Sequence, residues 1–331
     1  MLKKWYCQAD VTLRITPIDP ILVKSGVAQV VGADMHPVAM KNSEGDETYY
    51  LPGTSLKGVL RSHLERISRT LAPGSVCIPY YDPGKTQIRE SIAVEDERRS
   101  FGCGYLLATT QSKPATYRMA CPVCRIFGLL GFSGRLAIAD AIQVDGQRPL
   151  KEYRNGVGID RFTGGTAHGV LFNQEVLVGG MYETTIRLTN FELWQLSALM
   201  HLLMDMKDAM LQVGSGRSRS LGRFSAEPAK FCLTYLRRPS ADPSNHLRGL
   251  FEMELKTVQE EYGLLNWAPA SLVALPESDN RGLRVTYDIL ADWESKATAL
   301  TDGFVVALDE YAARQDIANH RREYATAHRI G

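Results

Sequence analysis

The chain has 331 residues, of which 44% are hydrophobic and 23% charged, and its formal net charge is +1. This length and composition are typical of a soluble globular protein with a substantial core. No apolar run is long enough to cross a bilayer, and the first residues lack the apolar segment of a signal peptide. We therefore expect a cytoplasmic protein with no membrane partner.

The two ends of the chain differ in charge. Residues 1–240 hold 29 Lys+Arg against 22 Asp+Glu, whereas residues 241–331 hold 9 against 15. A basic body followed by an acidic part indicates that the first 240 residues meet an anion.

The first expected elements are a strand and a helix. Apolar residues alternate over 5–15, which predicts a half-buried strand, and the loop GADMHPV (32–38) follows it. Thr54 or Ser55 can cap a helix whose apolar face repeats at helical spacing. That face consists of Leu60, Leu64, Ile67 and Leu71. Residues 74–124 lack periodicity and indicate an irregular insertion.

Further elements follow in the second half. We expect strands at 135–144, 182–188 and 223–236, and a helix at 191–207 capped by Asn190. The Gly- and Thr-rich segment 153–172 suggests a long, mobile excursion between them. Another helix is expected near 298–327.

Strand, helix, strand, strand, helix, strand is the order of an α+β, ferredoxin-like (RRM-type) fold. We expect this palm to occupy residues 1–236, with insertions at 74–130 and 150–175. Residues 237–331 would form a partly helical, acidic C-terminal extension.

Two glycine-containing basic motifs are candidate anion sites. LPGTSLKGVLR (51–61) places backbone N–H groups, Lys57 and Arg61 at a helix start, where a phosphate is favoured. GSGRSRSLGRF (214–224) spaces three arginines with small residues, which suits a phosphate backbone, and it lacks the Gly-Lys-Ser/Thr ending of a P-loop. The structural alternatives are an ordinary capped helix and a solvated turn.

The six cysteines should be reduced in a cytosolic chain, so their clustering indicates metal rather than disulfides. CPVC at 121–124 has two further cysteines upstream, and four thiolates can close a structural zinc site. The expected ligands are Cys77, Cys103, Cys121 and Cys124. The wide spacings leave His63 or another group as an alternative ligand. Cys7 and Cys232 lie in expected strands and suit the core.

Five stretches together resemble the RAMP superfamily, specifically the backbone subunit of type III CRISPR effector complexes. They are GADMHPV, YYLPGTSLKGVLRSHLE, CPVCRIFG, IDRFTGGTAHGVLF and GSGRSRSLGRF, in the family's order over about residues 8–235. The cysteine-bearing insertion is similar to that of only some branches, subtypes D and E among them. The resemblance implies an RRM-like palm with a thumb, a hairpin or loop that presses on a duplex of guide and target RNA.

The resemblance also implies residue roles. Asp34 matches the family's nuclease aspartate, which would act with Mg²⁺ or Mn²⁺ and leave a 2′,3′-cyclic phosphate. The resemblance assigns no role to His36; proton transfer and hydrogen bonding within its loop are the two alternatives for it. The implied guide contacts are Ser55, Lys57, Arg61, Gly216, Arg217 and Arg219, and the thumb contacts are Arg161, Phe162 and Thr163. The expected partners are guide RNA, complementary target RNA and other effector subunits.

Three functional hypotheses stay open. The first is an RNA-guided endoribonuclease subunit that uses Asp34. The second is a scaffold that only holds guide RNA. The third is a stand-alone guide-processing ribonuclease, which would cut by general acid–base catalysis without metal.

Overall fold

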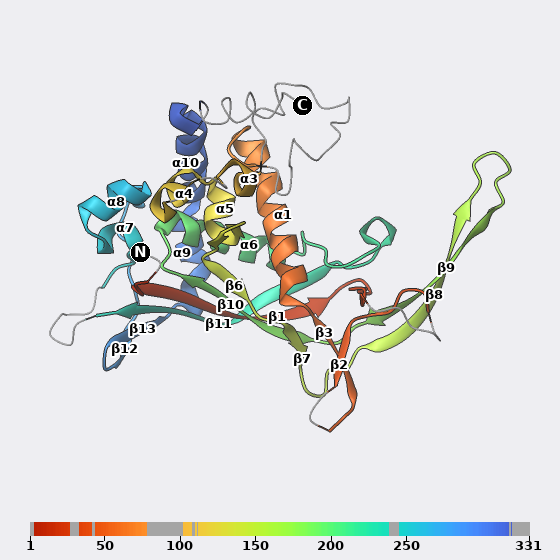
Figure 1. Ribbon diagram of the computed structural model, residues 1–331. Coiled ribbons are helices and arrows are strands. Elements are labelled where there is room, and N and C mark those ends of the chain that lie inside the picture. Colours follow the sequence, from red (N-terminus) through yellow and green to blue (C-terminus); the bar gives the residue numbers. More distant parts are fainter. Residues whose placement is uncertain are drawn as a thin grey trace.

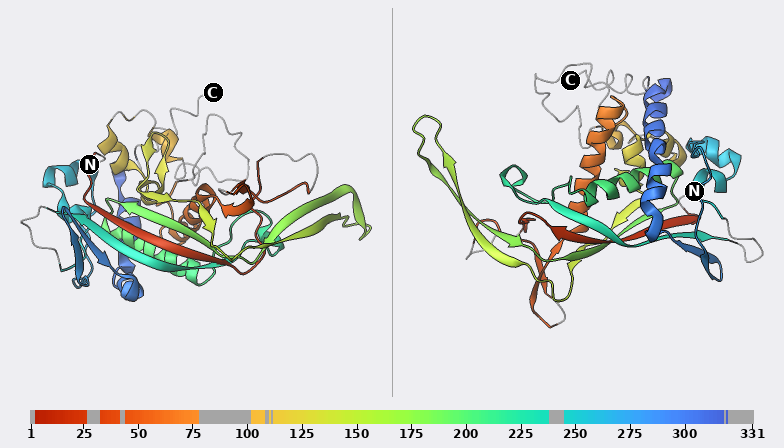
Figure 2. Two further views of the ribbon diagram at one scale, coloured as in Figure 1. Left: turned by 90° about the horizontal axis from the view of Figure 1, so that it is seen from below. Right: turned by 180° about the vertical axis from the view of Figure 1, so that it is seen from behind.

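The computed structural model describes residues 3–26, 33–41, 44–77, 102–107, 110, 112–237, 245–317 and 319. Within them the chain forms one large antiparallel sheet, with helices packed on one of its faces and a long hairpin projecting from one end (Figures 1 and 2). The predicted α+β fold is confirmed. No helix in these described ranges is long and apolar enough to span a membrane.

The centre of the sheet is β1 (Cys7–Pro17), and it carries the predicted alternation. Cys7, Ala9, Val11, Leu13 and Ile15 point into the core, where each is at most 1% exposed. β1 pairs antiparallel with β10 (Tyr182–Thr189) on one side and with β11 (Phe224–Leu236) on the other. Because side chains alternate across a strand, this pairing leaves a second, polar face on the same strands.

The four strands of the predicted palm lie in the order β11, β1, β10 and then β6 (Leu136–Ile138) with β7 (Ala141–Gln143). The sheet extends beyond them at both ends. β13 (Arg284–Asp288) and β12 (Ser278–Arg281) lie beside β11, and β3 (Glu47–Leu51) and β2 (Ala39–Lys41) lie beside β7. The C-terminal part of the chain therefore contributes strands to the same sheet.

The strand expected at 135–144 is interrupted between β6 and β7. There the carboxylate of Asp140 accepts a hydrogen bond, 2.7 Å long, from the backbone N–H of Gly53, the first residue of α1 (Gly53–Leu71). A side chain at Gly53 would lie 2.4 Å from the Ile138 carbonyl oxygen, so only glycine fits at this contact. The predicted cap at Thr54 or Ser55 is wrong, because Asp140, distant in sequence, satisfies the helix start instead.

The second palm helix, α6 (Leu193–Lys207), begins later than predicted. Its cap is Glu192, which forms a capping box with Gln195. Asn190 instead has a positive φ of 50°, and its side chain accepts hydrogen bonds from the backbone N–H groups of Tyr6 and Cys7. The helix is buried on nearly all sides, because α10 (Thr301–Ala313) packs on it.

The segment expected to be a long excursion is a regular hairpin, which we call the thumb hairpin. It consists of β8 (Leu150–Ile159) and β9 (Thr166–Val178), paired antiparallel from Leu150–Val178 to Ile159–Thr166. Figure 2 shows it reaching well beyond the sheet. Its two strands satisfy each other's backbone groups, which explains how a Gly-rich sequence stays extended.

The cysteine-bearing insertion is helical where the structure describes it. It contains α3 (Cys103–Leu106), α4 (Lys113–Met119) and α5 (Pro122–Phe127), followed by the small hairpin of β4 (Gly128–Leu129) and β5 (Phe132–Ser133). Residues 78–101 of the predicted insertion lie outside the described residues.

The C-terminal part is partly helical, as expected. It comprises α7 (Leu250–Met253), α8 (Lys256–Tyr262), α9 (Trp293–Ala299) and α10. The expected helix near 298–327 is two helices, α9 and α10, and its end beyond 319 lies outside the described residues. The domain boundary at 236/237 stays a prediction.

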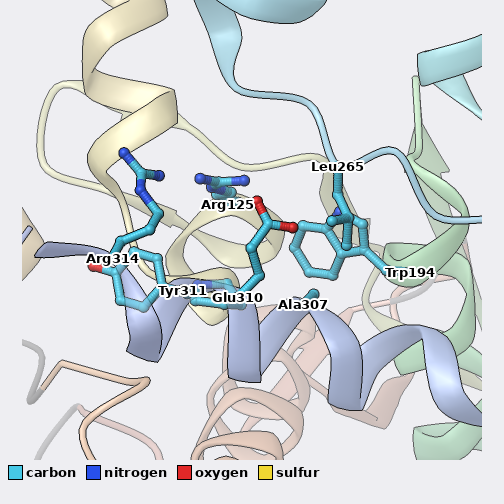
Figure 3. Close-up of a pocket in the computed structure, with 8 residues that line it drawn as sticks. Arg125, Trp194, Leu265, Ala307, Glu310, Tyr311 and Arg314 are labelled. Carbon is cyan, nitrogen blue, oxygen red and sulfur yellow. The ribbon is translucent and has the colours of Figure 1, made fainter. Parts of the chain in front are cut away.

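Helix α10 fastens the insertion to the palm. The Tyr311 hydroxyl donates to the Met119 carbonyl oxygen (3.0 Å), and Arg314 donates to that of Arg118 (2.6 Å), at the end of α4. Figure 3 shows Tyr311 and Arg314 beside Arg125 of α5. The cavity between them has a volume of about 10 Å³, far below the several hundred Å³ of a typical ligand site, so it is a packing feature.

Candidate nucleic-acid interface and metal centre

The loop with Asp34 lies against the middle of strand β9 in the thumb hairpin. The Asp34 carboxylate accepts a hydrogen bond from the Asn173 backbone N–H (3.0 Å). Met35 pairs with the same edge of this strand: its N–H donates to the Asn173 carbonyl oxygen (3.2 Å), and its carbonyl oxygen accepts from the Glu175 N–H (2.8 Å). Asp34 itself is exposed, so its carboxylate is held in place and remains accessible.

His36 lies on the inner side of this loop. Its side chain is buried, and its Nδ1 has no hydrogen-bond partner among the described residues. Its carbonyl oxygen accepts from the Ser25 N–H, which ties the loop to the segment after β1. His36 lies two residues after Asp34, but its ring is buried whereas Asp34 is exposed. A catalytic role for His36 therefore stays a prediction.

A polar network next to the loop uses the neighbouring acidic side chains. Lys151 of β8 forms ion pairs of 3.1 Å with both Glu47 and Glu175, and the Tyr49 hydroxyl donates to Glu47. The hydrogen bonds from Tyr49 and Lys151 lower the pKa of Glu47. Glu47 and Glu175 are thus paired with Lys151, whereas Asp34 is exposed and forms no ion pair within the described residues.

The glycine-rich loop is a structured turn beside the same hairpin. Gly214 has φ +87°, and a side chain there would lie 2.3 Å from the Leu22 carbonyl oxygen; Gly222, with φ +89°, approaches Val213 as closely. These glycines are therefore required by contacts within the protein. Between them lies the 3₁₀ turn η1 (Arg217–Arg219), whose residues are all exposed.

Arg219 connects this turn to the thumb hairpin. Its guanidinium lies 5.0 Å from the ring centroid of Phe172, a cation–π contact. Phe172 pairs with Gly156 across the hairpin, and a side chain on Gly156 would collide with the ring. Arg217 is also exposed, and Gly216 has a left-handed conformation with φ +74°.

A small apolar cluster holds these parts together. Leu22, Val176 and Leu221 are fully buried against one another, with Met35 and Val178 packed on them. They come from the segment after β1, the thumb hairpin, the glycine-rich loop and the Asp34 loop. Asn173, Phe172 and this cluster were not identified from the sequence, and no local pattern marks them, because each acts through a partner far along the chain.

The tip of the thumb hairpin presents the three predicted contact residues. Asp160 accepts hydrogen bonds from the Phe162 N–H (3.0 Å) and the Thr163 hydroxyl (2.8 Å), which fixes the turn. Phe162 is fully exposed at 101%, and Arg161 is exposed beside it. The strand from Thr166 to Asn173 is roughly 20 Å long, so the shaft of the hairpin, and not its tip, is beside Asp34.

Helix α1 contributes a third basic region. Thr54, Lys57 and Arg61 line a groove of about 1040 Å³ between its first turns and the strands β4–β6. Cys77, Cys103 and Cys124 line the same groove. Ser55 and Lys57 are half-buried. Burial lowers the pKa of Lys57 below its ordinary value of 10.5, and the positive charge of Arg61 lowers it further. Such a group gains from a nearby phosphate, which would neutralise this repulsion.

Arg61, one turn further along α1, has several partners within the protein. It donates to Glu65 Oε1 (2.9 Å), to the Gly128 carbonyl oxygen (2.9 Å) and to Cys124 Sγ (3.2 Å). The predicted role of Arg61 as a guide contact stays a prediction.

The open face of the central strands is polar. Arg14 pairs with Glu183 (3.4 Å) and Arg187 with Asp10 (2.7 Å) across β1 and β10. On these two strands, described throughout, that face carries no aromatic residue. An RRM stacks RNA bases on aromatic residues of its sheet, so this face is not such a platform.

The four predicted cysteine ligands form one cluster. Their sulfur atoms all lie within 4.8 Å of one another, and all four side chains are buried and free of disulfides. Cys124 Sγ lies 3.5 Å and Cys121 Sγ 3.7 Å from Cys77 Sγ. A tetrahedral zinc site with 2.3 Å Zn–S bonds requires sulfur separations of roughly 3.8 Å, so the residues fit this ion.

The pKa values of the cysteine thiols in this cluster are shifted in opposite directions. Burial raises the pKa of the Cys121 thiol, but its hydrogen bonds with Cys103, Cys124 and Cys77 outweigh burial and hold that pKa well below its ordinary value. Hydrogen bonds with Cys103 and with Cys121 raise the pKa of Cys77 and of Cys124 well above the ordinary value. The alternative ligand His63 lies elsewhere, bonded through Nε2 to Asp205 (2.7 Å).

Comparison with known proteins agrees with this arrangement. A family model described as the RAMP superfamily matches residues 14–225. This span runs from β1 into β11 and includes the Asp34 loop, the cysteine cluster, the thumb hairpin and the glycine-rich loop. A search of curated proteins finds no match to the chain.

Proposed function

This chain belongs to the RAMP superfamily, and we propose that it is the guide-RNA-binding backbone subunit of a type III CRISPR interference complex that cleaves complementary target RNA. Membership implies a CRISPR-associated RNA-binding protein. The observation that carries the finer proposal is the Asp34 carboxylate, which is accessible and is anchored to the thumb hairpin through Asn173.

Backbone contacts would bind the guide RNA. The cationic groups available are Lys57 at the groove of α1, and Arg217 and Arg219 in the turn of the glycine-rich loop. Ser55 and Gly216 add small polar or backbone contacts next to them. Because base pairing selects the target in an RNA-guided system, the protein needs to read ribose and phosphate rather than bases. The polar open face of the sheet agrees with recognition by loops.

Cleavage would be a transfer of the phosphate within the target strand. The 2′ oxygen of one ribose forms a bond to the adjacent phosphorus, the bond from phosphorus to the 5′ oxygen breaks, and the products are a 2′,3′-cyclic phosphate and a 5′-OH. Asp34 would take the proton of the 2′-OH or position the divalent ion. Mg²⁺ commonly uses one or two carboxylates together with substrate phosphates, and when bound it stabilises charge on the phosphate.

The thumb hairpin and the cysteine cluster would have structural roles. The exposed ring of Phe162 at the tip can press on a base step of the guide–target duplex. The zinc ion would hold the insertion against α1, where the first turns face RNA. Contacts with neighbouring effector subunits belong to the same proposal.

The test is the assembled complex with Asp34→Ala and a complementary RNA. We expect guide and target binding at wild-type affinity and loss of cleavage at the site of this subunit. The control is Asp309→Asn, an exposed acid on α10. An unchanged cut pattern would leave the scaffold function instead. Cleavage of repeat RNA by the isolated chain in EDTA would favour the stand-alone processing enzyme.

A further inference from the structure

The guanidinium of Arg61 lies between α1 and the cysteine cluster. Its Nη2 donates to Cys124 Sγ at 3.2 Å, while Nη1 donates to the carbonyl oxygen of Gly128, the residue at the end of α5. The helix α5 carries Cys124. Arg61 therefore holds both a metal-ligating sulfur and the C-terminal end of the helix that positions this sulfur.

A buried carboxylate fixes Arg61 in this orientation. Glu65, one turn along α1, accepts from Nε of Arg61 at 2.9 Å and from Arg69 at 3.3 Å. The side chain of Glu65 is 8% exposed and that of Arg61 19%. A lysine could not make the three bonds of Arg61 together, because only the planar fork of guanidinium presents its donors in several fixed directions.

The negative charge of a zinc ion bound by four thiolates would be stabilised by a cationic hydrogen-bond donor such as Arg61. Zn²⁺ with four thiolates has a net charge of −2, and each of these cysteines is at most 1% exposed. Burial of net charge is unfavourable unless it is paired or hydrogen-bonded. A charge-assisted N–H···S bond reduces the electron density on the sulfur and offsets part of this cost.

We propose that Arg61 is an outer-sphere residue of the zinc site, which stabilises the Cys124 thiolate and couples the metal to helix α1, rather than a ligand of RNA phosphate. Lys57 and Arg61 both line the groove. Each guanidinium nitrogen of Arg61 has a partner within the protein, whereas Lys57 makes no side-chain hydrogen bond or ion pair within the described residues. Lys57 and Arg61, one turn apart on the same helix, thus have two different tasks. The zinc ion would hold α1 in the orientation that presents Lys57 to the groove; this last step alone rests on the proposed function.

The experiment compares Arg61→Met with Arg69→Met in the full chain. Arg69 is the matched control, since it shares Glu65 and bonds the Cys77 carbonyl oxygen but no sulfur. Zinc affinity is measured by competition with a chromophoric chelator. Outer-sphere partners typically contribute 10–100-fold in metal affinity, so Arg61→Met should weaken zinc by that factor while Arg69→Met stays close to wild type.

A second readout uses Co²⁺ in place of zinc. The sulfur-to-cobalt charge-transfer bands should shift in Arg61→Met, because the thiolate loses its donor, and should not shift in Arg69→Met. If Arg61→Met is insoluble, Arg61→Lys is measured instead with the same expected directions. Wild-type zinc affinity together with unshifted bands would overturn the proposal.

Measuring RNA affinity as a function of salt concentration distinguishes the two possible roles of Arg61. Loss of one phosphate contact reduces the slope of log affinity against log salt by about 0.7 for single-stranded RNA. We expect that reduction for Lys57→Gln and none for zinc-loaded Arg61→Met. A reduced slope for Arg61→Met with unchanged zinc affinity would make Arg61 a phosphate ligand. An unchanged slope for Lys57→Gln would count against the proposed RNA site and leave the zinc result intact.

Discussion

The Asp34 carboxylate accepts its hydrogen bond from the Asn173 backbone N–H, on the side of β9 that faces away from β8. An otherwise irregular loop is thereby docked as a short additional pairing on the thumb hairpin. The position of the proposed catalytic acid depends on a strand of the projecting thumb hairpin, so the Asp34 loop and this hairpin form one structural unit.

Asn173→Pro should separate these two parts. Proline removes the N–H that Asp34 uses, and a proline is tolerated where the N–H of a strand faces away from its ladder. Hydrogen bonds to charged groups contribute about 1.5–3 kcal/mol, which corresponds to a roughly 10–100-fold lower cleavage rate if the carboxylate must be held in place. The cleavage rate is measured under single-turnover conditions. Asn173→Ala keeps the N–H and should cleave at the wild-type rate; equal loss in both variants would contradict the anchoring role.

Replacement of Cys121 and Cys124 by serine should abolish zinc binding. Elemental analysis should find one zinc per wild-type chain and none in the double variant. Because the ion would join α3, α5 and the segment that follows α1, we expect a lower melting temperature and poorer assembly. Cys232→Ser is the matched control, since Cys232 is buried in β11 away from the cluster and should keep the ion. Equal stability of metal-free and metal-loaded protein would contradict a structural role.

Phe162→Ala should alter RNA handling without altering stability. The ring is fully exposed, so its removal costs no core packing, and the melting temperature should stay unchanged. Base–aromatic contacts contribute about 1–3 kcal/mol, so we expect roughly 5–100-fold weaker target engagement or displaced cuts. Gel analysis of the cut positions measures this. Leu272→Ala, another exposed apolar residue at 77%, is the control; the same effect in both variants would contradict a specific tip contact.

The affinity for RNA should fall as pH rises above neutrality toward 10.5. Burial and Arg61 lower the pKa of Lys57, and a bound phosphate would raise it again. Binding therefore takes up a proton in the window between the lowered and the ordinary pKa, and affinity decreases with pH across it. Fluorescence anisotropy at constant ionic strength measures the dependence. Lys57→Arg keeps the positive charge at every pH in this window, so the pH dependence of RNA affinity should disappear. If this variant keeps the wild-type pH dependence, another group titrates.

Much of the palm could be predicted because its information is local. The alternation of β1 and β10, and the apolar periodicity of α1, follow from the side chains that each element buries, and these patterns repeat within about ten residues. The helix starts could not be predicted equally well. The Asp140 carboxylate accepts from the Gly53 N–H at the start of α1, and Glu192 caps α6. Thr54, Ser55 and Asn190 are residue types that commonly cap helices, but they do not cap these two. A backbone N–H can donate to any well-placed acceptor, including one far along the chain.

The sequence by itself determined the strand and helix order, the basic character of the glycine-containing loops and the identity of four cysteines able to bind one metal ion. Only the tertiary structure decided that Asp34 is held by Asn173, that Arg219 stacks on Phe172 and that Arg61 bonds a cysteine sulfur. Each of these three contacts joins residues that lie tens of positions or more apart in the sequence. Such contacts depend on how the sheet and its hairpin bring distant segments together, which no residue type or local spacing specifies.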